Sequence, residues 1–389
     1  MFTKRILFKG FDQKKKNPKI INYLNELKKK FYNNSNSVLV SLSKNYKYSF
    51  DIKKIKNFKK YKNFRIFGMG GSILGAEAIY FFLKKKIKKN FFFINNINTE
   101  NKLKNDKKFF NIIISKSGNT LETIANFNSS KVKKNCLFIT ENKKSHLRNL
   151  AFQLKSEVID HNNFIGGRYS VLSETGMLPA VLMGLNPKKF KQFDHLINNK
   201  KFLNTLVLNA SAILSFHNSG KTNSIILNYD ESSKEIFDWY HQLVAESLGK
   251  KIKGIQPIIS SMPKDNHSVM QLYLDGIKNN FFTFFITKEK KSAKILNSKL
   301  LGTLDHLKNK NLNDVTYSQF LATQNIFKRK NIPFRSFIIK KRNEETLGEL
   351  FTFFILETIL IGRSLNIDPF NQPAVELIKK ETSKVLKSI

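Results

Sequence analysis

The residues from Phe64 to Gly75 read Phe-Arg-Ile-Phe-Gly-Met-Gly-Gly-Ser-Ile-Leu-Gly, a short apolar run that ends in glycines. A segment of helical length, Gly75–Leu83, follows directly. Glycines let the backbone of such a turn approach a ligand closely, and a helix N-terminus offers unpaired N–H groups to an anion. The stretch therefore predicts a strand, a tight turn and a helix, the repeating unit of an α/β sheet.

The same alternation continues along the chain. Short apolar runs predict strands at Phe64–Phe67, Phe91–Ile94, Asn111–Ile114, Leu137–Thr140, Ser224–Leu227, Pro257–Ser260, Phe281–Ile286 and Phe334–Ile338. Longer segments predict helices at Ile20–Phe31, Leu121–Val132, Ser145–Leu154, Lys234–Leu248, Ser268–Lys278, Tyr317–Lys328 and Thr346–Arg363, with a helical stretch from Pro179 to His217. Such alternation is typical of β-α-β units. We therefore expect an α/β fold with two halves, each a mostly parallel sheet flanked by helices.

The length of 389 residues suggests two domains at about 100–200 residues each. We place an N-terminal helical segment at 1–60, a first α/β domain at 61–190, a second at 191–370 and a C-terminal helix at 371–389. No linker rich in proline or serine separates the halves, so we expect them to pack together.

The charge is strongly positive, with 68 Lys and Arg against 29 Asp and Glu, a net +39. Such an excess raises the question of a nucleic-acid partner. The lysines, however, form short runs along the whole chain, such as Lys28–Lys30, Lys84–Lys86 and Lys340–Lys341. Asn, Ile and Phe are also frequent, a joint bias that an AT-rich coding sequence produces. We favour this compositional explanation and expect no specific nucleic-acid partner, with a selected nucleic-acid surface as the open alternative.

Cysteine content and hydropathy bear on the compartment. Cys136 is the single cysteine, so no intrachain disulfide can form. The first ten residues lack the apolar segment of a secretory signal. Leu350–Ile361, the longest apolar stretch, is well short of the ~20 residues that span a bilayer. We expect a soluble cytoplasmic protein with no membrane association.

A second loop, Ser115-Lys-Ser-Gly-Asn-Thr-Leu-Glu-Thr123, follows a predicted strand and begins a helix. Its four hydroxyl side chains belong to Ser115, Ser117, Thr120 and Thr123. Hydroxyl and amide donors gathered at a helix N-terminus suit a phosphate. A helix cap alone would need one hydroxyl, so we favour phosphate binding. In an open parallel sheet this loop and the turn at 68–75 would meet at the carboxyl ends of neighbouring strands and form one site.

With both loops considered, the sequence resembles the glucose-6-phosphate isomerase family. Six motifs occur in family order: the glycine loop Gly68–Gly75, the phosphate loop Ser115–Thr123, Gly166-Gly-Arg-Tyr-Ser170, Gln242-Leu-Val-Ala-Glu-Ser-Leu-Gly-Lys250, Asp265-Asn-His-Ser-Val-Met-Gln271 and Pro369-Phe-Asn-Gln-Pro-Ala-Val-Glu-Leu-Ile-Lys379. Each is a moderate signal, and together they are highly specific. The resemblance implies two sugar-isomerase (SIS) domains, each a doubly wound and mostly parallel sheet.

The resemblance also implies reversible isomerisation of glucose 6-phosphate and fructose 6-phosphate through a cis-enediolate, in glycolysis and gluconeogenesis. Glu246 matches the catalytic base, and a carboxylate suits this role because it can take and return a proton on one face. Arg168 would stabilise the developing enediolate oxygens. His267 and Lys379 match residues linked to ring opening and substrate hydroxyl contacts. The substrate-binding positions that match are Gly71, Ser72, Ser115, Lys116, Ser117, Thr120, Thr123 and Gln372.

Further implications concern partners and cofactors. In the family the histidine comes from the neighbouring subunit, which implies a homodimer with composite sites. We expect no metal and no cofactor, because the seven histidines show no metal-ligand spacing. Without the motif, Glu246 could equally be an exposed helix residue paired with Lys250 at i+4. A bifunctional isomerase that also accepts mannose 6-phosphate and a non-catalytic sugar-phosphate sensor are the alternative functions.

Overall fold

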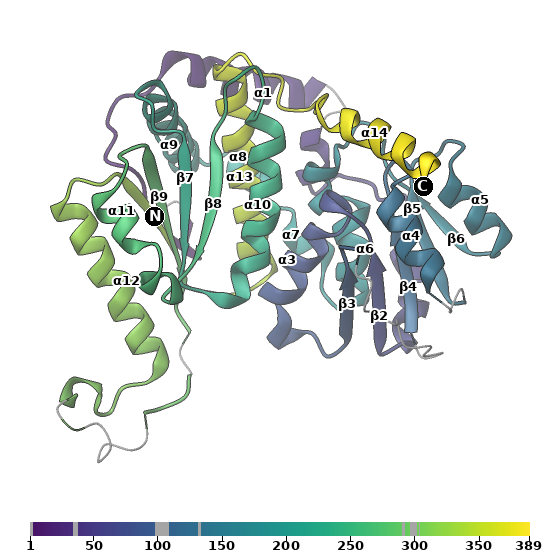
Figure 1. Ribbon diagram of the computed structural model, residues 1–389, viewed down its shortest axis with the longest axis horizontal. Coiled ribbons are helices and arrows are strands. Elements are labelled where there is room, and N and C mark those ends of the chain that lie inside the picture. The colour runs from purple at the N-terminus through teal and green to yellow at the C-terminus, as the bar shows by residue number, and fades with distance from the viewer. Residues whose placement is uncertain are drawn as a thin grey trace.

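The computed structural model describes residues 3–33, 38–97, 109–130, 134–289, 292–295, 302 and 304–389. Two five-stranded sheets stand side by side, and helices α3, α10 and α13 lie between them (Figure 1). This arrangement confirms the expected α/β fold with two parallel-sheet halves. The predicted helix at Leu121–Val132 runs in part into positions 131–133, outside the described residues.

The first sheet is wholly parallel, with the order β3-β2-β4-β5-β6. Its strands are β2 (Asn63–Phe67), β3 (Asn90–Ile94), β4 (Phe109–Ile114), β5 (Cys136–Thr140) and β6 (Glu157–Asp160). Strand β4 is apolar and almost fully buried, as expected of a parallel strand covered on both faces. From β2, the chain goes to β3 on one side and later to β4 on the other, so the strand order switches direction between β2 and β4.

The second sheet repeats this order as β1-β10-β9-β7-β8. Its strands are β1 (Ile6–Lys9), β7 (Asn223–Asn228), β8 (Gln256–Ser261), β9 (Asn280–Thr287) and β10 (Phe334–Ile339). All neighbours are parallel except β1, which pairs antiparallel with β10. From β7 the chain again goes to one side, to β8, and then to the other, to β9.

Fourteen α-helices surround the sheets in the described part of the chain. They are α1 (Pro18–Asn33), α2 (Ile52–Lys56), α3 (Leu74–Phe82), α4 (Leu121–Ser129), α5 (His146–Gln153), α6 (Glu174–Leu182), α7 (Pro187–Phe190), α8 (Phe193–Ile197), α9 (Lys200–Asn218), α10 (Lys234–Leu248), α11 (Met270–Asp275), α12 (Leu312–Arg329), α13 (Glu344–Ser364) and α14 (Val375–Ser388). No described helix is long and apolar enough to cross a membrane.

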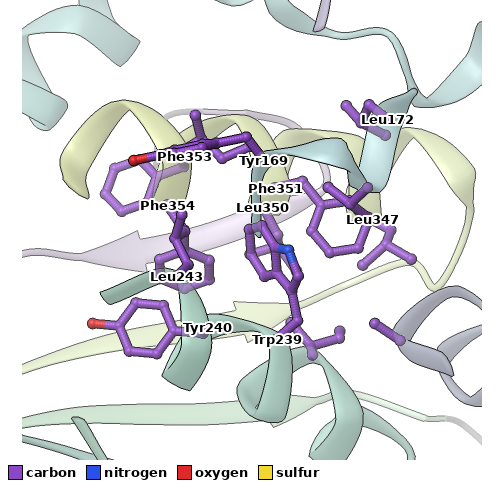
Figure 2. Packing of buried hydrophobic residues seen from close by; sticks show 14 of the residues in the cluster. Tyr169, Leu172, Trp239, Tyr240, Leu243, Leu347, Leu350, Phe351, Phe353 and Phe354 are labelled. Carbon is purple, nitrogen blue, oxygen red and sulfur yellow. The ribbon is translucent and has the colours of Figure 1, made fainter. Parts of the chain in front are cut away.

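The core between the halves holds α10 in place. Aromatic and aliphatic side chains of α10 face those of α13 in Figure 2. The rings of Trp239 and Phe351 lie 4.7 Å apart, and those of Tyr240 and Phe354 lie 4.8 Å apart. All four side chains are buried, and burial of a large apolar side chain stabilises a fold by roughly 1.5–3 kcal/mol. Helix α10 is therefore a rigid support for any residue on its other face.

Two edge strands differ from the sequence predictions. The N-terminal segment 1–60, expected to be helical, contributes β1 to the second sheet, where Ile6 lies opposite Ile339. Strand β6 was not predicted, because Glu157–Asp160 spans only four positions and has just two apolar residues, Val158 and Ile159, between charged ones. Both pairings depend on partners elsewhere in the chain rather than on local pattern. The domain limits at 61–190 and 191–370 remain our proposal.

Candidate active site

Two loops meet at the switch point of the first sheet. The glycine loop (Gly68–Gly75) follows β2, and the hydroxyl loop (Ser115–Thr123) follows β4. The strands are paired in parallel, with Phe67 beside Ile113. A Cβ added at Gly68 would lie 3.3 Å from the Ile114 carbonyl oxygen, so the two loops start side by side. Open α/β sheets bind ligands at this place, outside the carboxyl ends of the strands.

The hydroxyl loop is a preorganised turn. The Ser115 and Thr120 hydroxyls are hydrogen-bonded at 2.7 Å, and the Gly118 amide donates to the Ser115 hydroxyl at 3.1 Å. Gly118 has a φ of +68°, a conformation that glycine adopts without strain. A Cβ there would also lie 2.2 Å from the Ser145 hydroxyl. The loop therefore presents Ser117 and the N-terminus of α4 outward, in a geometry suited to an anion.

The lysine of this loop is partly buried. Lys116 donates through Nζ to the Asn163 carbonyl at 2.7 Å and lies 3.5 Å from Glu141. Burial lowers its pKa, and pairing with Glu141 opposes that effect. Thr123 lies in the first turn of α4, where its buried hydroxyl has no hydrogen-bond partner among the described residues. Lys116 is thus positioned beside the loop as a nearby cation.

The glycine loop contacts α10 and the segment that carries Arg168. A Cβ at Gly71 would lie 2.1 Å from the Gly167 carbonyl carbon, so only glycine allows these two backbones to meet. A Cβ at Gly70 would lie 2.6 Å from the Gln242 side-chain nitrogen. Ser72 ends the short 3₁₀ helix η3 (Gly70–Ser72) beside them. The loop therefore connects the hydroxyl loop to α10 and to the segment that carries Arg168.

Arg168 is buried and fully hydrogen-bonded, with a side-chain exposure of 1%. Its five N–H groups donate to the Ser247 hydroxyl (2.8 Å), the Glu246 carboxylate (2.9 Å), the Gln372 side-chain oxygen (2.8 Å), and the carbonyls of Pro369 (2.6 Å) and Asn371 (3.1 Å). A guanidinium has five N–H donors, and all of them are used. Arg168 thus joins α10 to the segment before α14.

Glu246 stands in the last turn of α10 with both carboxylate oxygens held. One accepts from Arg168, and the other accepts from the Gln242 amide at 2.8 Å. The side chain keeps 28% of its surface exposed, so a substrate can reach it. Seven residues earlier, on the same side of the helix, Trp239 is buried and donates to the Arg168 carbonyl at 3.1 Å. The helix therefore presents an oriented carboxylate beside the glycine loop.

Gln242 is a site residue that the sequence analysis did not single out. It lies four residues before Glu246, and residues four apart share one helix face. It begins the motif Gln242–Lys250, and its position four residues before Glu246 was the signal that could have identified it. Its side-chain oxygen is buried without a partner among the described residues.

Comparisons with known proteins identify the family of this chain. The family model described as Phosphoglucose isomerase matches residues 46–389. A glucose-6-phosphate isomerase from Methanocaldococcus jannaschii is 33% identical, over 87% of this chain and 88% of that protein. The chain belongs to the phosphoglucose isomerase family.

Solved structures show the same fold. A hypothetical protein from Thermus thermophilus superimposes with a TM-score of 0.83 at 21% identity, covering 95% of each chain. A glucose-6-phosphate isomerase from Chlamydia trachomatis gives a TM-score of 0.69 at 19% identity, covering 86% of this chain and 72% of that one. This phosphoglucose isomerase family member therefore shares their double-sheet architecture.

Two predicted catalytic residues of this family member lie apart from the Glu246 cluster. His267 ends the 3₁₀ helix η7 (Lys264–His267) after β8, where it is exposed and has no hydrogen bond within the described chain. Lys379 lies on α14, pairs with Glu376 at 2.6 Å and is 65% exposed. The structure brings together Glu246, Arg168, Gln372 and the two loops. The roles of His267 and Lys379 remain predictions.

Lys250 adds a second cation behind Arg168. It donates to the Asp368 carbonyl. Burial and then repulsion from Arg168 lower its pKa to about 8. It does not pair with Glu246, as the i+4 spacing had allowed, because Arg168 and Gln242 occupy both oxygens of that carboxylate. In the described part of this phosphoglucose isomerase family member, no group of three His, Cys, Asp or Glu side chains could hold a metal ion.

Proposed function

We propose that the chain interconverts glucose 6-phosphate and fructose 6-phosphate, with Glu246 as the base. The hydroxyl loop and Lys116 bind the phosphate. Glu246 takes the proton from C2 of the open-chain aldose, which gives the cis-enediolate. The same carboxylate returns the proton to C1, while a proton passes from O2 to O1, so the ketose forms without gain or loss of atoms. The names of the relatives and the match of the family model support this assignment.

One observation carries the proposal: the Glu246 carboxylate is oriented by two hydrogen bonds yet remains reachable, next to the glycine loop. An oriented carboxylate loses little entropy when it transfers a proton, and general-base catalysis contributes about 10²–10⁴ in rate. Arg168 has all its donors engaged within the chain, so its first role is to hold Glu246 and the 369–372 segment. Its positive charge still favours an enediolate formed beside that carboxylate.

The test is Glu246→Gln, assayed with fructose 6-phosphate in the presence of a chelator. We expect kcat to fall by about 10²–10⁴, while protection against thermal unfolding by inorganic phosphate is kept. Glu381→Gln is the matched control, because it breaks an exposed ion pair with Lys384 outside the site. Wild-type turnover by the Glu246→Gln variant would refute the assignment.

We also propose that the protein is a homodimer whose sites combine residues of both subunits. Helix α14 supports this, since Leu377, Ile378 and Leu386 are 69%, 70% and 53% exposed although apolar. Exposed apolar side chains gathered on one helix are typical of an interface. His267 is exposed as well, at the carboxyl end of the second sheet, and would enter the partner's site.

Subunit mixing tests the composite site. Glu246→Gln and His267→Ala variants are each expected to be nearly inactive. A mixed dimer contains one site with a native Glu246 and a native histidine from the other subunit. Random reassociation of equal amounts makes about half of the dimers mixed, and one of the two sites in each is active. Mixing should therefore restore up to about a quarter of wild-type activity. If mixing restores no activity while native mass spectrometry shows mixed dimers, the two residues act within one subunit. We place the reaction in the cytoplasm, in glycolysis and gluconeogenesis; the single, buried thiol of Cys136 is in keeping with a reducing compartment.

A further inference from the structure

A cavity of about 750 Å³ lies at the carboxyl end of the second sheet. Its walls come from the loop after β7 (Tyr229–Ser232) and from the end of β9 with the two residues that follow it (Ile286–Glu289), with α12 on a third side. The volume falls in the range of about 300–1,000 Å³ that is usual for small-molecule sites. None of the residues assigned to the isomerase site lines it.

The position of this cavity repeats that of the isomerase site. Strands β7 and β9 are neighbours at the switch point of the second sheet, as β2 and β4 are in the first. After β2 the chain forms η3 and then α3, and after β7 it forms the 3₁₀ helix η6 (Glu231–Ser233) and then α10. The cavity therefore occupies the place where this sheet topology binds ligands.

Its side chains differ from those of the first switch point. Asp230 accepts from the Thr287 hydroxyl at 2.7 Å and from Arg342 at 2.9 and 3.0 Å. Glu289 accepts from Arg342 at 2.9 Å and pairs with Lys85. The carboxylates are thus held in place by cations, and Lys85 comes from the first half, in η4 (Lys84–Lys86). The cavity lies at the seam between the halves, a frequent place for ligand sites.

We propose that this cavity is a second ligand site, which takes an unphosphorylated polyhydroxyl compound such as a free sugar or sugar alcohol. Carboxylate oxygens of Asp230, Glu231 and Glu289 can accept hydrogen bonds from ligand hydroxyls, and such charge-assisted bonds are the stronger ones. Tyr317 supplies a ring at the wall, with the Lys288 ammonium 4.6 Å from its centroid.

The same groups disfavour a phosphate ligand. A phosphate dianion would face four acidic side chains (Asp230, Glu231, Glu289 and Asp314) beside three lysines (Lys85, Lys288 and Lys340), and the charge of Arg342 is shared between Asp230 and Glu289, so the wall offers it no net positive charge. The glycine loop of the first half has no glycine counterpart here, since the loop after β7 reads Tyr-Asp-Glu-Ser-Ser from position 229, and the segment after β9 begins with Lys-Glu rather than with hydroxyl residues. The first switch point would then bind the sugar phosphate, and the second would bind the neutral sugar.

The test measures binding of D-sorbitol and D-glucose to the full chain by saturation-transfer NMR, with inorganic phosphate present in excess to occupy the first site. Thr316→Trp places an indole in the cavity from the partly exposed wall helix α12. Leu321→Trp is the matched control, on the same helix at a 40% exposed position outside the cavity. Ser115→Ala reports on the first site. Melting temperatures and isomerase activity are recorded for every variant.

We expect wild type, Leu321→Trp and Ser115→Ala to bind sorbitol, and Thr316→Trp to bind it at least about tenfold more weakly, because the indole fills space that the sugar would occupy. If Thr316→Trp melts early, Glu231→Leu serves instead, with the same expectation. The proposal is overturned by absence of binding to wild type, by binding that cavity variants leave unchanged, by loss of binding in Ser115→Ala, or by displacement of sorbitol by phosphate. An inactive protein that still binds sorbitol in the cavity would refute only the isomerase assignment.

Discussion

The two halves share one strand order, but their switch-point loops carry opposite chemistry. In the first half the loops are rich in glycines and hydroxyls, and Gly71 lets the glycine loop meet the backbone of Gly167, next to Arg168. In the second half the equivalent loops carry Asp230 and Glu289, joined by Arg342. The fold therefore determines where a ligand can lie, and the side chains determine which ligand it is.

Helix α10 connects the two places. It begins at the second cavity, directly after η6, and its last turn carries Glu246 at the first site. Fifteen residues at 1.5 Å each separate its ends by about 22 Å. Glu246, the proposed base, thus comes from the second half, and Arg168 of the first half holds it. Variants of equivalent positions in the two halves can show how far this division of roles extends.

Among variants that compare the two halves, the largest effect is expected from Gly71→Ala. Its Cβ would lie 2.1 Å from the Gly167 carbonyl and 2.6 Å from the Arg168 amide, so the backbone at Arg168 must shift. A displacement of about 1 Å in a site can cost ~100-fold in rate, and we expect at least that loss in kcat/KM. The equivalent position in the second half is Ser232, and Ser232→Ala should keep full activity. Equal activities of the two variants would contradict the comparison.

The hydroxyl loop comes next. Ser115→Ala removes the partner of Thr120 and of the Gly118 amide, and a donor for phosphate. We expect KM for fructose 6-phosphate to rise about 10- to 100-fold, the loss of one or two hydrogen bonds to a charged group. Thr287→Val removes a comparable hydroxyl in the second half and should leave KM unchanged. A similar rise in both variants would indicate a general loss of structure.

Local sequence pattern was sufficient to predict most of the strands and helices and the position of the hydroxyl loop between a strand and a helix. Long apolar strands such as β4 and β9 have the composition of buried parallel strands, and the loop after β4 gathers its hydroxyls within nine residues. Strand β1 could not be predicted, because its pairing partner, β10, lies more than 300 residues later.

The contacts that join distant segments at the site could not be predicted from local sequence pattern either. The hydrogen bonds from Arg168 to Pro369 and Gln372 span about 200 residues, and only family resemblance had linked these segments. The second cavity was not anticipated either, since its loops contain no motif and become neighbours only when β7 pairs with β9. Topology, rather than spacing in the chain, creates such sites.

A smaller effect is expected at the seam, where Glu77 on α3 lies near Glu235 on α10. Burial raises the pKa of Glu77 to about 7, a hydrogen bond from Asn95 opposes this, and Glu235 adds to it. The folded chain therefore binds this proton more tightly than the unfolded chain, whose carboxyl titrates near 4.5. The contribution of this proton to the free energy of unfolding is complete below pH 4.5 and is lost as the pH rises through 7.

In Glu77→Gln no carboxyl titrates at this position, so the loss of stability with rising pH disappears. The glutamine side-chain oxygen still accepts a hydrogen bond from Asn95. We expect the variant to be more stable than wild type by about 1–3 kcal/mol at pH 8 and nearly equal to it at pH 4.5. Urea unfolding at the two pH values measures the difference, with exposed Glu381→Gln as the control. The same change in stability at both pH values would exclude titration of Glu77 as its cause.

The smallest effect is expected from salt, and it separates the two ligand classes. The net charge of +39 attracts a dianionic sugar phosphate, and salt screens that attraction, with a Debye length that falls to about 10 Å at 0.1 M. We expect kcat/KM to fall a few-fold as potassium chloride is raised, with kcat unchanged. Sorbitol carries no charge, so its affinity for the second cavity should not respond to the same titration. A flat kcat/KM would show that the positive charge has no role in substrate capture. A salt-dependent affinity for sorbitol would show that the second cavity does not select its ligand by neutral hydroxyl groups.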